Sequence, residues 1–276
     1  MKGASAQQDK PVSGPPPCSA SEKFLEIELW VYAALTVVCV VSGFIDAVAG
    51  GGGLLTMPAL LSAGLPPHLA LGTNKLQSSM GVAMATRTYR RKGLLQIRPH
   101  LGTVACVFIA SALGALAVQA LEARILNLVV PVLLVPCAAY VIFSPRMDDT
   151  DRIEVLSRKG YIPVASGIGF YDGFFGPGAG SFFTTSLVAL RGMGLTRASA
   201  LTKLFNTTSN LGSLLMFVAG GQVLWTLGLC MAIGTVTGSW LGSHSAIRFG
   251  ARLIRPLLVT ISLLLTARLI WGYFTG

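Results

Sequence analysis

One stretch of this chain reads Gly43-Phe44-Ile45-Asp46-Ala47-Val48-Ala49-Gly50-Gly51-Gly52-Gly53, and Thr73-Asn74-Lys75-Leu76 follows it. A second stretch repeats the plan: Gly169-Phe170-Tyr171-Asp172 leads to Gly176-Pro177-Gly178-Ala179-Gly180, and Leu201-Thr202-Lys203-Leu204 comes later. Each copy has an aspartate in an apolar run, then a glycine cluster, then a lysine in another apolar run. Ionisable groups in such runs are costly and indicate function. Glycine-broken helices at matching positions of two halves are typical of a transporter binding site.

The composition is that of a membrane protein. Of the 276 residues 53% are hydrophobic and 12% charged, and the mean hydropathy is +0.67, whereas about a quarter of a soluble protein is charged. The net charge of +10 comes from basic residues between apolar runs, and no basic nucleic-acid-binding motif is present, so no nucleic-acid partner is expected. The five cysteines form no CxxC pair and the three histidines are scattered, so we expect no metal and no cofactor.

The apolar runs predict an all-α polytopic membrane protein made of two homologous repeats, since a helix needs about 20 residues to cross a bilayer. The first repeat, residues 29–143, has long helices at 29–49, 69–89, 101–121 and 125–143 and a short one at 54–63. The second, residues 161–276, has helices in the same order at 161–175, 197–219, 223–243 and 252–273, with a short one at 181–190. Each repeat therefore has four long helices plus one short broken helix.

Two segments lie outside the repeats. Residues 1–28 are rich in proline and lack the basic start and apolar core of a signal peptide, so we expect a disordered N-terminal tail. Residues 144–160 form a polar connector, expected on the cytoplasmic side. The offset between the repeats is 126 from Asp46 to Asp172 and 128 from Lys75 to Lys203, which indicates diverged copies with two residues inserted in the second short segment.

The placement of lysine and arginine predicts that the repeats are inverted. Of the 21 basic residues, 15 lie in loops or at helix ends outside the tail. If each short helix carries the chain to the other side, 14 of these share one side and only Arg124 lies opposite; otherwise the split is 9 to 6. The larger group is Arg87, Arg90, Arg91, Lys92, Arg98, Arg146, Arg152, Arg158, Lys159, Arg191, Arg197, Arg248, Arg252 and Arg255. Because basic loops stay in the cytoplasm, we favour the inverted arrangement, with both termini outside.

The two lysines are expected deep in the membrane. Lys75 comes eight residues after Pro67 and twelve before Arg87, which places it ~12 Å and ~18 Å from those helix positions. Residues three, four and seven positions after each lysine share its helical face, and they include hydroxyl and amide side chains typical of a polar cavity. The candidate substrate-binding residues are Lys75, Lys203, Asn74, Ser78, Asn206, Asn210, Gly52, Gly53, Gly178 and Ser181, with Asp46 and Asp172 as candidates for coupling.

The glycine clusters have a functional and a structural interpretation. Where the helix resumes, near Leu54 and Ser181, exposed backbone N–H groups favour an anion. Alternatively, the glycines serve close helix packing, and the lysines and aspartates are buried pairs that only hold helices together. In both interpretations each lysine should lie close to an aspartate.

These stretches resemble the TauE/SafE sulfite-exporter family, and more closely its YfcA-like membrane transporters. The resemblance continues through Pro58-Ala59-Leu60-Leu61, Ala70-Leu71-Gly72 and Lys203-Leu204-Phe205-Asn206-Thr207-Thr208-Ser209-Asn210. It covers the chain apart from about the first 28 residues. It implies a multi-pass carrier in the bacterial inner membrane that moves sulfur-containing anions such as sulfite, sulfoacetate or related organosulfonates.

The function expected is therefore a secondary transporter that exports small sulfur-containing anions, with proton coupling through the aspartates. The expected partners are a small anionic substrate and the lipid bilayer, and a homodimer is left open. The alternatives are a transporter of another small anion and a passive anion channel. An intramembrane enzyme using Ser181 is disfavoured, because no histidine lies at a helix centre to act as its base.

Overall fold

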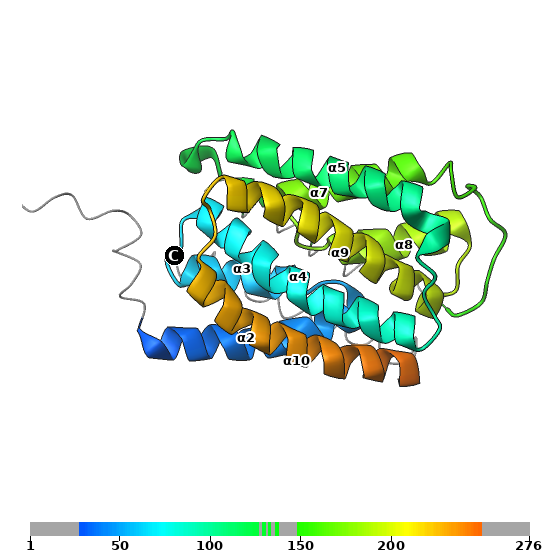
Figure 1. Ribbon diagram of the computed structural model, residues 1–276, viewed down its shortest axis with the longest axis horizontal. Coiled ribbons are helices and arrows are strands. Elements are labelled where there is room, and N and C mark those ends of the chain that lie inside the picture. Colours follow the sequence, from blue (N-terminus) through cyan, green and yellow to red (C-terminus); the bar gives the residue numbers. More distant parts are fainter. Residues whose placement is uncertain (1–27, 127–128, 131, 134–135, 138–147, 250–276) are drawn as a thin grey trace, which may run out of the picture.

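The structure is a computed structural model that describes residues 28–126, 129–130, 132–133, 136–137 and 148–249. Within these residues the chain is all-helical, as predicted, and the helices lie side by side in one bundle (Figure 1). The expected tail at 1–27 and the expected helix at 252–273 fall outside the described residues, as do residues 144–147 of the connector.

The helices follow the predicted order. In the first half they are α2 (Leu29–Ala49), α3 (Gly53–Ser62), α4 (Pro67–Arg91), η2 (Arg98–His100) and α5 (Leu101–Gln119). In the second half they are α7 (Ile162–Phe174), α8 (Ala179–Arg191), α9 (Leu195–Ala219) and α10 (Trp225–Phe249). The described residues between 123 and 137 are helical too, in the region where a long helix was expected at 125–143.

One helix is shorter than the prediction of four long helices per repeat requires. Helix α7 has 13 residues, as many as α8, so each is about 20 Å long. Helix α7 stops at Phe174 because the chain then turns through Gly176 and Gly178, whose φ angles are 100° and 85°. Such positive angles are open to glycine and strained for other residues.

Helices α2 and α10 run parallel and pack closely along glycines. Gly234 of α10 lies against Thr36 of α2, and Gly242 lies against Phe44 further along. Helix α4 runs in the same direction, and all three begin at the left end of the bundle in Figure 1. An added Cβ on Gly242 would lie 2.4 Å from the carbonyl oxygen of Phe44, so only glycine permits this approach.

Helices α5, α7 and α9 run in the opposite direction, from right to left in Figure 1. The contact between α5 and α7 matches the one between α10 and α2. Gly114 lies against the carbonyl of Phe170, and these residues correspond to Gly242 and Phe44 at the offsets of 128 and 126. Each half therefore packs its first helix, α2 or α7, against the third predicted long helix of the other half, α10 or α5.

The short helices turn back instead of crossing the whole bundle. Helices α2 and α4 begin at the same end, so α3 between them returns to the end where α2 began (Figure 1). Its ten residues span about 15 Å. Helix α8 returns in the same way to the end where α7 began. Each short helix therefore brings the chain back toward the end where the preceding helix began, without a full crossing of the bundle.

The two broken segments touch backbone to backbone at the centre of the bundle. Gly50, with φ 82°, follows α2, and a Cβ on it would lie 2.5 Å from the carbonyl carbon of Gly180. A Cβ on Gly180 would lie 2.6 Å from the Cα of Gly50. The hydroxyl of Ser181 donates to the carbonyl of Ala49 at 3.2 Å. The glycines thus serve a close crossing of two helical hairpins, as their structural interpretation required.

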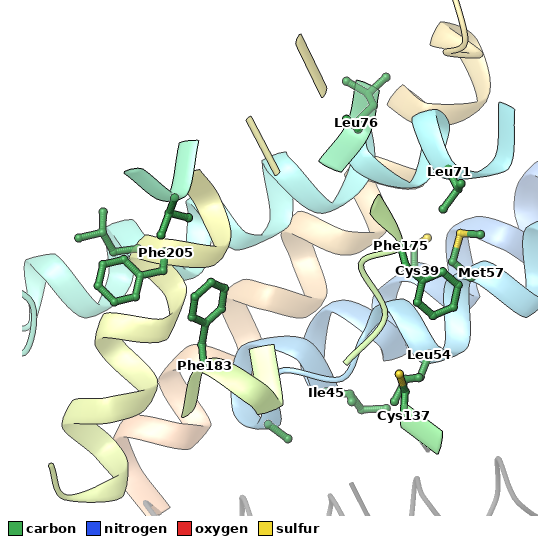
Figure 2. Close-up of a cluster of buried hydrophobic side chains, with 14 of the residues drawn as sticks. Cys39, Ile45, Leu54, Met57, Leu71, Leu76, Cys137, Phe175, Phe183 and Phe205 are labelled. Atoms are coloured by element: carbon green, nitrogen blue, oxygen red, sulfur yellow. The ribbon is translucent and has the colours of Figure 1, made fainter. Parts of the chain in front are cut away.

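Apolar side chains cover both the inside and the outside of the bundle. Figure 2 shows part of a buried cluster that includes Met57 and Leu71 from the first half and Phe183 and Phe205 from the second. Exposed apolar side chains follow the outer helices, for example Val37, Val41, Ile109, Leu113, Leu211, Leu215 and Ile233. Among the described residues, Leu29–Ala49 and Arg98–Gln119 are long and apolar enough to span a membrane, with mean hydropathies of 2.1 and 2.2.

The connector folds back on the turn between α8 and α9. The backbone N–H of Gly194 donates to Asp151 at 2.8 Å, and that of Thr196 donates to Asp149 at 2.7 Å. These carboxylates cap the first turn of α9, where negative charge is favourable. The hydrogen bond from Gly194, together with the Arg197 guanidinium, holds the pKa of Asp151 below its usual value. The described part of the connector, residues 148–160, is therefore hydrogen-bonded to the start of α9.

We predict that Gly50→Ala destabilises the protein far more than Gly64→Ala. Both glycines have φ near 80°, so both substitutions carry about 1–2 kcal/mol of backbone strain. Only a Cβ at position 50 overlaps another backbone, because Gly64 has nothing within 4 Å; that overlap adds about 1–3 kcal/mol. Thermal unfolding in detergent measures the difference, and equal losses of melting temperature would contradict the crossing.

Candidate functional site

A small hollow lies where the two hairpins meet α4 and α9. Its volume is about 20 Å³, enough for about one water molecule. It is lined by Asp46, Gly50, Gly53, Asn74, Lys75, Ser78, Val82, Asp172, Gly176, Gly178, Gly180, Asn206 and Asn210. The lining therefore combines charged side chains, amides and glycine backbone from both halves of the chain.

Lys75 of α4 forms a buried ion pair with Asp172 of α7. The amine lies 2.8 Å from Oδ1, and the two side chains are 1% and 3% exposed. The amine also donates to the backbone carbonyl of Asp172, and the hydroxyl of Ser209 donates to Oδ2. Both carboxylate oxygens of Asp172 are thus satisfied by donors.

Lys203 of α9 forms the corresponding pair with Asp46 of α2, but more loosely. The amine donates to the backbone carbonyl of Asp46 and lies 3.7 Å from Oδ2. Oδ1 accepts the N–H of Gly52 at 3.2 Å. Oδ2 is buried without a hydrogen-bond partner, although the side chain of Asp46 is 14% exposed.

The pairing is crossed between the halves. Each lysine binds the aspartate of the other half. Lys75 on α4 reaches Asp172 near the end of α7, and Lys203 on α9 reaches Asp46 near the end of α2. A lysine at the centre of a membrane helix costs about 2.5–3.5 kcal/mol, and a carboxylate at hydrogen-bonding distance offsets part of that cost. The predicted closeness of each lysine to an aspartate is confirmed, and both interpretations of the pairs remain compatible with it.

Amide and hydroxyl groups hold the lining in place. Oδ1 of Asn74 accepts hydrogen bonds from Thr56 of α3 at 2.6 Å and from Gln77 at 2.7 Å. At the offset of 128, Thr184 of α8 donates to Thr202 of α9 at 3.0 Å. Each short helix is thus fastened to the lysine-bearing helix that follows it.

Most of the predicted site residues line the hollow, and three do not. Lys203 is 1% exposed and lies behind Asp46. Gly52 binds the carboxylate of Asp46 through its N–H and accepts a hydrogen bond from Ser42. Ser181 bonds to Ala49. These three residues support the lining, and their assignment to substrate binding stays a prediction.

Sequence reasoning missed several residues of the site. The glycines predicted to bind substrate were Gly52, Gly53 and Gly178. The hollow is also lined by three glycines that were not predicted, Gly50, Gly176 and Gly180. Ser209 was missed because it lies six residues after Lys203, outside the spacing of three, four or seven that marks one helical face. Its contact is with α7, and only the packing of α7 on α9 reveals it.

We predict that Asp172→Asn lowers stability by about 3–5 kcal/mol, because it leaves Lys75 buried beside a neutral amide. The double variant Lys75→Met with Asp172→Asn should recover part of that loss, since no buried charge is left. The exposed pair of Arg197 and Asp151 provides the control, and Arg197→Ala should change the melting temperature little. A single variant as stable as the double variant would contradict this account.

Comparisons with known proteins agree with this architecture. The model of the sulfite exporter TauE/SafE family matches residues 35–269. A probable membrane transporter protein of Haemophilus influenzae is 41% identical over 253 residues, which cover 91% of this chain and 99% of the relative. The probable membrane transporter protein YfcA of Escherichia coli K12 is 41% identical over 235 residues, covering 85% and 87%.

A third relative, the probable membrane transporter protein ORF9 of Sinorhizobium sp., is 40% identical over 246 residues, covering 89% of this chain and 94% of the relative. No solved structure matches the chain significantly. The matched region contains both glycine clusters and both ion pairs. The chain is therefore a membrane-embedded, non-enzymatic transporter that belongs to the sulfite exporter TauE/SafE family.

Proposed function

We propose that this protein is a secondary carrier that exports small sulfur-containing anions such as sulfite, sulfoacetate or related organosulfonates. The observation that carries the proposal is the two buried lysine–aspartate pairs beside the broken helices, since Lys75, Asp46 and Asp172 line one polar hollow and Lys203 lies directly behind Asp46. Two buried cations near the middle of a bilayer favour an anion, and the family's description as sulfite exporters points to sulfur oxyanions.

The hollow itself supports a carrier that must change shape. Its volume of about 20 Å³ holds about one water molecule, so a sulfonate enters only when a lysine–aspartate pair separates. Asn206, Asn210 and Ser78 then offer amide and hydroxyl groups to the anion's oxygens. The N–H groups at the start of α3 and α8 add positive dipole ends.

The proposed repeats are inverted, with residues 29–143 and 161–276 as the two units and both termini outside the cell. Helices α2, α4 and α5 run opposite to their counterparts α7, α9 and α10, which is the relation that an inverted repeat requires (Figure 1). The described basic residues at 87–98, 152–159, 191–197 and 248 fall on the end expected to be cytoplasmic. We assign the protein to the bacterial inner membrane as a multi-pass protein.

We propose that the same pairs couple transport to protons. Protonation of an aspartate would release its lysine, which then has a net charge to offer an anion. In this scheme the anion and the proton occupy the site together. The direction of flow is then set by the anion gradient, the pH gradient and the membrane potential. Moving one elementary charge across a potential of 100 mV changes the free energy by about 2.3 kcal/mol.

We predict that Lys75→Ala and Lys203→Ala each lower anion flux at least about tenfold in proteoliposomes loaded with radiolabelled sulfite or sulfoacetate. A buried contact to a charged group contributes about 1.5–3 kcal/mol, and about 1.4 kcal/mol corresponds to a factor of ten. Lys92→Ala serves as the control, because Lys92 is exposed at the end of α4. Wild-type flux in both lysine variants would remove the lysines from the mechanism.

We expect the same proteoliposomes to accumulate the anion above its equilibrium level when a proton gradient is imposed across the wild-type protein. A carrier couples the two gradients, whereas a passive channel only lets the anion equilibrate. Fast flux without accumulation would therefore favour the channel over the carrier.

The substrate can be identified by thermal unfolding in the presence of sulfite, sulfoacetate, taurine, sulfate and thiosulfate. A ligand at a hundred times its dissociation constant stabilises the folded state by about 2.7 kcal/mol. We expect the sulfur anions to raise the melting temperature and the zwitterion taurine to have a smaller effect. A shift that persists in the Lys75→Ala variant would place the anion elsewhere.

A further inference from the structure

The two ion pairs differ in their bonding, and we propose that Asp46 alone binds and releases the coupled proton, while Asp172 stays ionised as a permanent partner of Lys75. The proposal rests on the proposed carrier function and names the residue that performs the coupling. It also assigns the released cation, which is Lys203.

Asp172 is held in its charged form from both sides. Lys75 lies 2.8 Å from Oδ1, and Ser209 donates to Oδ2. Hydrogen bonds and a cation on a carboxylate favour the ionised state. A proton could reach Asp172 only by displacing one of these donors, and the side chain is 3% exposed. Both oxygens of Asp172 are therefore already occupied by donors.

Asp46 lacks most of these donors. Among the described residues, the hydrogen bond to its carboxylate comes from the N–H of Gly52 at 3.2 Å, and Lys203 is 3.7 Å from Oδ2, beyond hydrogen-bonding distance. Oδ2 is buried with no hydrogen-bond partner, a state that costs about 1–3 kcal/mol or more for a charged group. A proton on Oδ2 removes the charge that is poorly compensated.

The sequence explains why the two aspartates differ. Ser209, which bonds to Asp172, corresponds to position 81 at the offset of 128 that relates Lys203 to Lys75. Position 81 is a glycine, so the first half has no hydroxyl to offer Asp46. The glycine itself is required, because a Cβ there would lie 2.3 Å from the methyl group of Thr235 in α10. Close packing of Gly81 against α10 therefore leaves Asp46 without the hydroxyl donor that Ser209 provides to Asp172.

The groups around Asp46 define what its protonation releases. The ionisable side chains that face it in the described part of the chain are Lys203 from α9 and, across the hollow, Lys75 from α4 and Asp172 from α7. Lys75 already has Asp172 as its partner. Lys203 lies behind Asp46, which lines the hollow. When Asp46 takes up a proton, Lys203 alone loses its counter-charge, and the neutral carboxyl group must move aside for an anion in the hollow to replace it.

The resulting step is balanced and involves one proton. The carboxylate of Asp46 and one proton from water form a neutral carboxyl group, and one anion binds to the ammonium of Lys203. No bond of the anion changes. A monoanionic sulfonate then moves with no net charge, whereas a dianion moves with one net negative charge. The stoichiometry of one proton for each anion distinguishes this scheme from one in which both aspartates titrate.

The direct test is infrared difference spectroscopy of the protein in lipid, titrated from neutral to mildly acidic pH. Exposed carboxylates, with an ordinary pKa of about 4, stay ionised over this range. We expect the C=O stretching band of one buried carboxyl group to appear in the wild type, to be absent in Asp46→Asn and to persist in Asp172→Asn. A band that survives in Asp46→Asn, or no band in the wild type, would overturn the proposal.

A second variant covers the case in which a neutral amide prevents folding. Asp46→Glu keeps the carboxyl group on a longer side chain, so the band should move in frequency, while Ser209→Ala should leave it in place. An unmoved band in Asp46→Glu would also overturn the assignment.

Transport separates this inference from the proposed function. Liposomes that contain a pH-sensitive dye report the protons carried with each sulfite or sulfoacetate anion, and we expect a ratio of one in the wild type. Residual anion flux in Asp46→Asn should carry no proton. A wild type that moves neither anion would defeat the proposed substrate, while the infrared band would still decide which aspartate takes up the proton.

Discussion

Burial of charge between two hairpins organises this molecule. Lys75 and Lys203 are each 1% exposed, and neither could stay charged there without a carboxylate at close range. The carboxylate comes from the other half in both cases, so neither half neutralises its own lysine. The crossing of Gly50 and Gly180 brings the two aspartates within reach, and the parallel packing of α2 with α10 and of α7 with α5 holds the hairpins at that crossing.

The sequence predicts a large part of this arrangement because membrane helices have a strong local signal. Helix α2 begins and ends where the apolar run does, at Leu29–Ala49, and the glycine clusters mark the breaks because positive φ angles need glycine. The lysines could be recognised as central from their distance to the helix ends. These inferences depend on neighbours along the chain and need no knowledge of packing.

Packing determines what the sequence could not supply. The spacing of residues on α9 identifies the face that carries Asn206 and Asn210, but it does not say that Lys203 lies behind Asp46 or that Ser209 reaches Asp172. The predicted bounds of α7, 161–175, agree with the observed Ile162–Phe174 to one residue at each end, but at 13 residues the helix is not one of four long helices. Where a broken helix stops depends on the turn and the helices packed around it, which an apolar pattern along the chain does not reveal.

The backbone contact between Gly50 and Gly180 has a mechanical consequence. Interlocking side chains would key the two hairpins into one orientation, whereas two bare glycine backbones touch over a very small area. Such a contact blocks closer approach but offers little resistance to tilting. In the proposed carrier this contact would serve as a pivot, about which α2–α3 and α7–α8 could tilt relative to each other without separating at Gly50 and Gly180.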